Sequence, residues 1–216
     1  MSPPAKTIAN PYDGGRLDFD WCVRFLEKHG RERYGASFRI HEEDHVVIYK
    51  LLVYFAALEP EAAAVDVDLN KGILLSGPVG CGKTRLLELM NLVGPEVRRF
   101  GIKPCREVSF EFIEEGYQVI NRYSRMSYNE KGSRTWCFDD LGTEQALKYY
   151  GNECNVIGEI LLSRYDHFFI SGMITHITTN LSASDIEAMY GNRVRSRMRE
   201  VFNLVSFPGM TKDKRV

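Results

Sequence analysis

The sequence contains few cysteines, and none of them form a paired motif. The five cysteines lie far apart, are odd in number and include no CxxC pair, which argues against a disulfide framework and a structural zinc site. The five histidines show no HExxH or other metal-ligand spacing, so they indicate no metal centre. This cysteine usage fits a reducing cytosol, and we expect a cytoplasmic protein.

The sequence also lacks a long hydrophobic run and a large net charge. The longest apolar stretch, residues 46–58, is interrupted by Lys50 and is too short to cross a bilayer. The first six residues lack the apolar core of a signal peptide. The formal net charge of the 216 residues is −1, so nucleic-acid binding would require a local basic patch. We expect one principal domain and no membrane partner.

The first part of the chain, residues 1–39, is predicted to form a tail and one helix. Residues 1–16 contain three prolines and two glycines, a composition that resists regular structure. Asp18 is a candidate N-cap for a helix over residues 19–29, with Gly30 just beyond its end. The apolar face of this helix either packs on the protein's own core or docks a partner, and the sequence leaves both open.

The rest of the chain, residues 40–216, is predicted to form the main domain. A second helix over residues 44–58 leads into short apolar runs that alternate with helical patterns, as in a parallel sheet covered by helices. Five runs are predicted to be strands, namely residues 72–76, 107–113, 135–138, 173–178 and 202–207. The predicted fold is α/β, with a central, mainly parallel five-stranded sheet and a small helical N-terminal extension.

The most specific motif directly follows the first predicted strand. Residues 77–84 match GxxxxGK[ST] in full, and a helical pattern follows, as this phosphate-binding loop (P-loop) requires. Its glycines let backbone N–H groups face a phosphate chain, and the helix dipole favours the anion. We predict that Lys83 neutralises the β- and γ-phosphates of ATP and that Thr84 binds Mg²⁺. The predicted nucleotide site comprises Gly77, Pro78, Val79, Gly80, Cys81, Gly82, Lys83, Thr84 and Arg85.

Further polar residues are predicted at the same edge of the sheet. The strand over residues 135–138 ends in two acids, of which Asp139 is assigned to the metal and Asp140 to the attacking water. Asn180 closes the strand that begins near residue 173, at the carboxyl edge where open parallel sheets bind ligands. Asn180 is therefore a candidate to orient the water or to contact the γ-phosphate.

Four arginines lie on a predicted helix near the end of the sequence. With about 100° per residue, Arg193 and Arg197 lie on one flank of its buried stripe, and Arg195 and Arg199 lie on the other. Planar guanidinium groups suit bidentate contact with phosphate. Because an arginine supplied from outside the P-loop greatly accelerates hydrolysis of a terminal phosphate, these residues are candidates for catalysis.

These segments together resemble the AAA+ ATPases. The resemblance is to the bacterial helicase-loader and transposition-helper group, DnaC/DnaI-like and IstB-like proteins, and it covers about residues 40–207. The matching pieces are residues 77–84, 139–144, 177–180 and 191–199. The fold implied by the resemblance is a three-layer P-loop NTPase of AAA+ type without a helical lid after the last strand.

The same resemblance implies roles for individual residues. Asn180 is similar to the sensor-1 residue, and Arg197 matches the arginine finger that reaches into a neighbouring subunit's ATP site, with Arg193 as its companion. The protein would then be a homo-oligomer with ATP between subunits. Most AAA+ proteins carry glutamate where this chain has Asp140, which is one methylene shorter.

A segment between two predicted strands, residues 114–134, interleaves aromatic and basic residues. Such residues can stack bases and follow a phosphate backbone, and in AAA+ assemblies this region tends to face the central channel. The alternative is a partly exposed amphipathic helix and loop. The candidate contacts to single-stranded DNA are Arg122, Tyr123, Arg125, Tyr128 and Lys131.

The leading functional hypothesis is an ATP-dependent switch in DNA transactions. It would hydrolyse ATP slowly unless assembled, and its partner would be a replicative helicase or a transposase. One alternative is a P-loop small-molecule or nucleotide kinase. Another is an ATP-binding adaptor with little turnover, which the short side chain of Asp140 favours.

Overall fold

The computed structural model describes most of the chain. The described residues are 12–13, 16–130, 132–144, 147–149, 152–209 and 211–214. The predicted N-terminal tail lies almost wholly outside them, and so does Lys131, one of the candidate DNA contacts.

A five-stranded parallel sheet forms the centre of the structure. Its strands lie in the order β11-β3-β10-β7-β4, and every neighbouring pair is parallel. The prediction of an α/β fold with a five-stranded sheet is therefore confirmed. The strands are β3 (Gly72–Ser76), β4 (Gly101–Pro104), β7 (Trp136–Leu141), β10 (Thr175–Thr179) and β11 (Phe202–Ser206).

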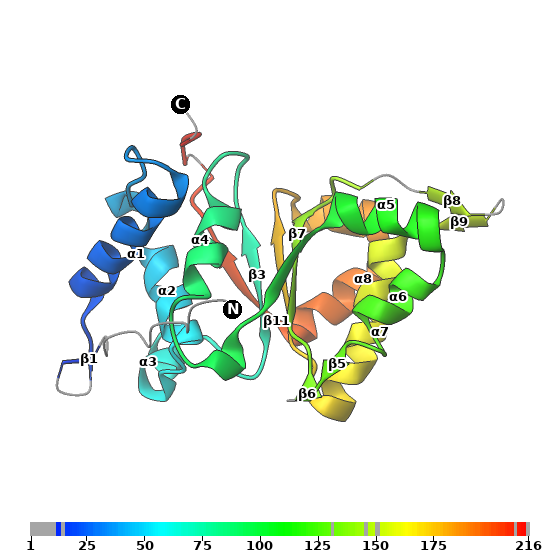
Figure 1. Cartoon of the computed structure of the whole chain (residues 1–216), viewed down its shortest axis with the longest axis horizontal. Coiled ribbons are helices and arrows are strands. Elements are labelled where there is room, and N and C mark those ends of the chain that lie inside the picture. The colour runs from blue at the N-terminus through cyan, green and yellow to red at the C-terminus, as the bar shows by residue number, and fades with distance from the viewer. Residues whose placement is uncertain are drawn as a thin grey trace, which may run out of the picture.

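Helices cover both faces of the sheet and complete three layers (Figure 1). One side carries α1 (Phe19–Tyr34), α2 (His45–Phe55), α3 (Glu59–Ala64) and α4 (Lys83–Met90). The other side carries α5 (Cys105–Glu115), α6 (Gln118–Tyr123), α7 (Val156–Ser171) and α8 (Ala183–Val201). Each side has its own hydrophobic core, because successive strand residues such as Cys137 and Phe138 point to opposite faces.

Short elements lie before or between these helices and strands. They comprise the hairpin pairs β1 (Tyr12–Asp13) with β2 (Arg16–Leu17), β5 (Tyr128–Asn129) with β6 (Gly132–Ser133) and β8 (Leu147–Tyr149) with β9 (Asn152–Cys154), and the 3₁₀ turns η1 (Glu42–Asp44) and η2 (Glu96–Arg98). No helix in the described part of the chain has the length and apolar character needed to span a bilayer.

The strand predicted over residues 107–113 is wrong, because this segment lies within helix α5. Alternating Val108, Phe110 and Phe112 imitate a strand, but Val108 and Phe112 are also four residues apart and share the buried face of a helix. Phe110 is 55% exposed. The fifth strand is instead β4, a short edge strand that ends in a proline, as edge strands tolerate.

Helix α1 begins where predicted and ends later. Asp18 caps it by accepting the N–H of Trp21 at 2.8 Å. Gly30 lies inside the helix and not beyond its end, and a Cβ there would lie 2.2 Å from the ring of Phe38. The helix ends at Gly35, which has φ 103°.

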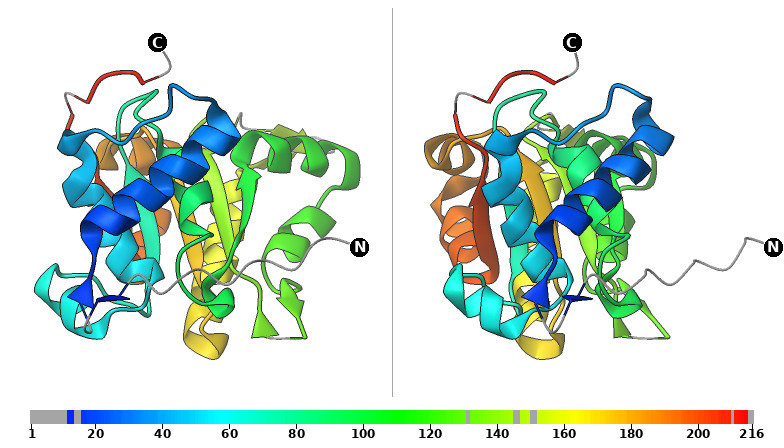
Figure 2. Two further views of the ribbon diagram at one scale, coloured as in Figure 1. Left: turned by 60° about the vertical axis from the view of Figure 1, so that its left-hand side comes forward. Right: turned by 90° about the vertical axis from the view of Figure 1, so that its left-hand side faces the viewer.

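The apolar face of α1 packs on the protein's own core, across α2 and α4 (Figure 2). The domain boundary at residue 39 stays a prediction.

Candidate nucleotide site

The predicted phosphate loop joins β3 to α4 at the carboxyl edge of the sheet. Gly80 and Gly82 have φ values of 82° and 97°, which glycine adopts at little cost. Lys83 is 5% exposed, and its Nζ donates to the carbonyls of Gly77 at 2.8 Å and Pro78 at 3.0 Å. No described side chain caps α4, so the N–H groups of its first turn remain available to an anion.

The predicted metal ligands lie in contact beside this loop. The hydroxyl of Thr84 donates to the carboxylate of Asp139 at 3.0 Å, and the hydroxyl of Thr178 donates to the same carboxylate at 2.6 Å. Burial raises the pKa of Asp139, the Thr178 hydroxyl opposes the rise, and the charge of Asp140 adds to it. A buried carboxylate beside a hydroxyl would gain from a cation, so these oxygens fit Mg²⁺.

Phosphate oxygens would have to complete such a metal site. In the part of the chain that the structure describes, no group of three or more histidine, cysteine, aspartate or glutamate residues could hold a metal ion. Mg²⁺ commonly uses one or two protein oxygens together with those of a bound nucleotide. Thr84 and Asp139 match that pattern.

A β-bulge brings the two acids to the same site. Ile177 pairs with Phe138 and Thr179 with Leu141, so Asp139 and Asp140 together oppose Thr178. In a regular strand these neighbours would point to opposite faces, and a bulge changes the direction of side chains. Asp140 has φ 55°, a left-handed conformation, and its N–H donates to the Thr178 hydroxyl at 2.8 Å.

These elements border a cleft of about 1320 Å³. Its lining includes the predicted residues Val79, Gly80, Cys81, Gly82, Lys83, Thr84, Arg85, Asp140 and Asn180. Asn180 is exposed at the end of β10, as its position after the strand predicted. Gly77 and Pro78 lie behind the lining and hold Lys83 through their carbonyls. The cleft is large enough for a nucleotide.

Sequence reasoning missed two walls of this cleft. One is the segment after α1, with Phe38 and Ile40, and the other is the C-terminal segment with Lys212 and Lys214. Both lie at the same end of the molecule as the phosphate loop (Figure 1). The N–H of Lys214 donates to the carbonyl of Gly80 at 3.0 Å, and its ammonium pairs with Asp44, which is 4% exposed. No motif marks these contacts.

The arginine segment lies apart from the cleft. Among the described residues that line the cleft, neither Arg193 nor Arg197 occurs. Arg193 is exposed, whereas the guanidinium of Arg197 lies 4.8 Å from the ring centre of Tyr165 on α7. Arg195, on the other flank, pairs with Glu187 at 2.5 Å. Arg195 and Arg197, which were predicted on opposite flanks, therefore contact different residues, and the predicted pairing of Arg193 with Arg197 stays a prediction.

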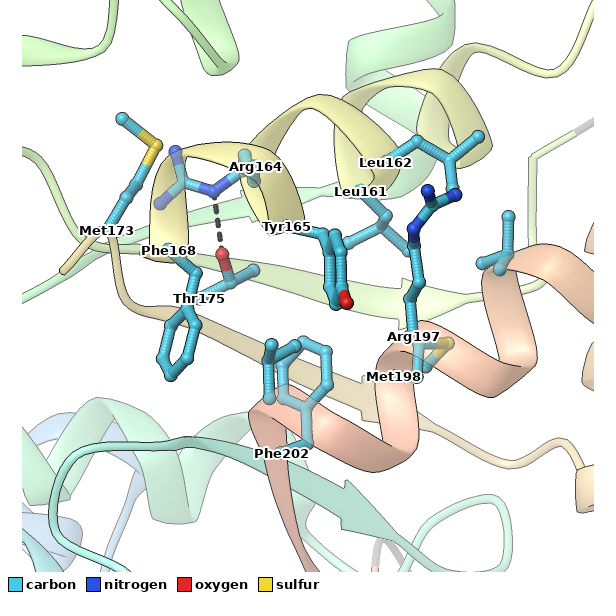
Figure 3. A pocket seen from close by; sticks show the side chains of 12 residues that line it. Leu161, Leu162, Arg164, Tyr165, Phe168, Met173, Thr175, Arg197, Met198 and Phe202 are labelled. Atoms are coloured by element: carbon cyan, nitrogen blue, oxygen red, sulfur yellow. Dashed lines mark hydrogen bonds between the residues drawn. The ribbon is translucent and has the colours of Figure 1, made fainter. Parts of the chain in front are cut away.

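Arg197 also lines a small cavity of about 20 Å³ between α7 and α8 (Figure 3). A second arginine in its wall, Arg164, is 1% exposed and donates to the Thr175 hydroxyl at 2.7 Å and to the backbone carbonyls of Tyr123, Arg134 and Ile174. Burial lowers the pKa of Arg164 to about 9. Its contacts join α7 to three neighbouring segments, so its role is structural.

The candidate DNA contacts have unequal surroundings. Tyr123 is 4% exposed and packs against Trp136 and Phe138, so its ring has no free face for a base. Arg122 pairs with Glu111 and Glu115, and the Tyr128 hydroxyl contacts His167 at 3.2 Å. Arg125 is exposed.

Solved structures similar to this one include the following two. The DnaC helicase loader is 18% identical and aligns over 78% of this chain and 92% of its own, with a TM-score of 0.55. A putative primosome component from Streptococcus pyogenes serotype M3 is 17% identical over 86% of this chain and 91% of its own, with a TM-score of 0.56. The fold is the AAA+ type of P-loop fold. No family model and no curated protein match the chain.

This similarity confirms the predicted fold class. In this sheet the phosphate loop, the two acids and Asn180 lie at the ends of the neighbouring strands β3, β7 and β10. At this level of identity the likeness extends to the fold alone, and function has to be argued from the site.

Proposed function

We propose that this chain binds Mg-ATP and hydrolyses it as an oligomeric switch in DNA transactions, such as helicase loading or transposition. The observation that carries the proposal is the convergence of Lys83, Thr84, Asp139 and Asp140 at one edge of the sheet. The fold shared with a helicase loader and a primosome component supports the link to DNA replication.

The residues at this site have separate roles in hydrolysis. Lys83 and the N-terminus of α4 neutralise the phosphates, while Thr84 and Asp139 would hold Mg²⁺, which supplies further positive charge. Asp140 accepts a proton from the attacking water, and Asn180 orients that water. Arg197, with Arg193, comes from a neighbouring subunit, because both lie outside their own cleft.

The proposed binding of single-stranded DNA rests on the exposed Arg125, with Arg122 and Tyr128 near it in the sequence. Such contacts would organise single-stranded DNA along the assembly. The partner would be a replicative helicase or a transposase. Phosphate release measured with and without single-stranded DNA tests this part.

Asp140→Asn is the decisive variant. The amide cannot accept the proton, so kcat should fall at least about 100-fold while the Kd for ATP stays within about twofold. Asp66→Asn is a matched control, because Asp66 is also exposed with φ 55° but is remote from the cleft. ATP binding by calorimetry and steady-state phosphate release measure the two quantities.

Other results of these measurements would contradict parts of the proposed function. Turnover of Asp140→Asn equal to that of Asp66→Asn would remove Asp140 as the base. Phosphate transfer to an added acceptor in place of hydrolysis would indicate a kinase, and a single burst without turnover would indicate an adaptor. If the wild-type chain binds no ATP, the nucleotide function is wrong.

A further inference from the structure

A buried contact joins the turn after Asp140 to helix α8. Glu144 is 7% exposed, and one of its carboxylate oxygens accepts the N–H of Gly142 at 3.0 Å. The other oxygen accepts the hydroxyl of Tyr190, which is 9% exposed. Burial, followed by the charge of Glu144, raises the pKa of Tyr190 far above its usual range. The tyrosine is therefore a permanent donor to this carboxylate.

The backbone of the turn from Asp140 to Glu144 is held by further contacts, so a displacement of one of its residues shifts the others. The N–H and the hydroxyl of Thr143 both donate to the carbonyl of Asp140, at 3.1 and 2.7 Å. Gly142 has φ 101°, and a Cβ there would lie 2.6 Å from Leu181. A shift of the Glu144 carboxylate would pull on the Gly142 N–H and thereby on Asp140, which belongs to the same turn.

On the other side of the contact, α8 is kinked. Tyr190 immediately precedes Gly191, whose φ of 84° and ψ of 160° interrupt the helical conformation. Apart from Gly191 itself, its two chain neighbours and the backbone of its own helix, no described atom lies within 4 Å of the position that a Cβ at Gly191 would take. Glycine is therefore needed there for its backbone conformation and not for close packing. Arg193 and Arg197 follow the kink.

We propose that Glu144 and Tyr190 are positioning residues that couple Asp140 to the arginine-bearing segment of α8 in the same subunit. The inference rests on the proposed ATPase function. When Arg193 and Arg197 engage a neighbour's nucleotide, rotation at Gly191 moves Tyr190, and Glu144 passes the movement to the turn. Hydrolysis at one ATP site then depends on occupancy of the next, a coupling carried by this chain's own hydrogen bonds.

Tyr190→Phe, in the full-length chain, removes the hydroxyl and keeps the ring. Tyr123→Phe is its matched control, because Tyr123 belongs to the same core and its hydroxyl also donates to a glutamate, Glu111, at 3.1 Å. Hydrogen exchange of the amides of residues 139–144, measured without nucleotide, should become about tenfold faster in Tyr190→Phe only. The same variant should lose about tenfold in kcat, with KM for ATP within about twofold.

A second variant tests the coupling without touching the contact. Gly191→Ala disfavours the kink conformation and leaves the side chains of Glu144 and Tyr190 chemically unchanged. We expect it to lower the Hill coefficient of ATP hydrolysis toward 1, as Tyr190→Phe also should, while exchange of residues 139–144 stays at the wild-type rate.

These measurements separate the inference from the proposed function. If Tyr190→Phe matches Tyr123→Phe in both exchange and kcat, the positioning role is wrong. A wild-type Hill coefficient of 1 that neither Tyr190→Phe nor Gly191→Ala changes would overturn the coupling, even with ATP hydrolysis intact. A wild-type chain that hydrolyses no ATP refutes the proposed function itself and removes the coupling with it.

Discussion

The nucleotide cleft and the arginine segment of α8 differ in how their functional groups are held. At the cleft, Lys83 and Thr84 in the lining and Asp139 behind Thr84 are buried or half-buried and are fixed by hydrogen bonds of 2.6 to 3.0 Å. In α8, Arg193 is exposed and Arg197 lies on its own Tyr165. The first group is preorganised within the subunit, whereas under the proposed function the second acts only in the ATP site of a neighbouring subunit.

This difference has a physical origin. Parallel strands place their carboxyl ends together, so the register of β3, β7 and β10 fixes the cleft as soon as the sheet forms. The sheet register does not fix residues on the outer surface of a helix. Their side chains contact whichever neighbouring groups lie within reach. Proteins that share a catalytic site between subunits would be expected to divide their residues in this way.

The largest expected effect comes from Arg197→Ala. If Arg197 acts in a neighbouring site, this variant should bind ATP normally and lose about 1000-fold or more in kcat. Arg199→Ala, an exposed arginine on the other flank, is the control. Steady-state ATPase assays over a range of protein concentrations measure the effect, and the wild-type rate per subunit should rise with concentration.

Mixing variants provides a stronger form of this test. Arg197→Ala keeps an intact cleft, and Asp140→Asn keeps an intact arginine segment, so mixed assemblies should regain activity that neither variant has alone. Turnover that is independent of concentration and insensitive to Arg197→Ala would mean that one subunit is complete by itself.

Asp139→Asn should have the next largest effect, about 100-fold in kcat at saturating ATP, because the metal loses a charged ligand. The same variant should unfold at a higher temperature. The pKa of Asp139 is raised in the fold, so the folded chain binds this proton more tightly than the unfolded chain does, and the charge destabilises the fold at neutral pH. The amide removes that penalty.

Thermal unfolding of Asp139→Asn at neutral pH, with Asp140→Asn beside it, checks the stability part. Asp140 is exposed, so its amide variant should leave the unfolding temperature nearly unchanged. A lower unfolding temperature for Asp139→Asn would show that hydrogen bonds from Thr84 and Thr178 outweigh the cost of burying the charge.

The sequence predicted best those features that depend on adjacent residues. The phosphate loop is a continuous motif between a strand and a helix, and the structure has it there. Two acids at the end of a strand predicted a polar edge, but the bulge that sets both acids opposite Thr178 depends on the partner strand. Such pairing is not visible in a single segment.

Other features could not be predicted because their partners lie far apart in the chain. Glu144 contacts Tyr190, and Arg197 contacts Tyr165, although neither pair has a local signal. Residues 107–113 were predicted to be a strand because their apolar residues fit both periods, and the packing of α5 on α6, α7 and the sheet decides for the helix.

The smallest expected effect is a change in kcat on substitution of Tyr165, and an increase and a decrease have different meanings. If Arg197 acts in a neighbouring site, it must leave the ring of Tyr165, and a cation–π contact at a half-exposed site contributes about 0.5–1 kcal/mol. Tyr165→Leu should therefore raise kcat about two- to fivefold. Tyr165→Phe keeps the ring under Arg197 and loses the hydroxyl, which bonds Glu200 and also contacts Arg197, so it should raise kcat less than Tyr165→Leu does. In an Arg197→Ala background, Tyr165→Leu should have no effect. A lower kcat for Tyr165→Leu would instead mean that the ring holds Arg197 in its working position, so that part of the arginine segment is as preorganised as the cleft.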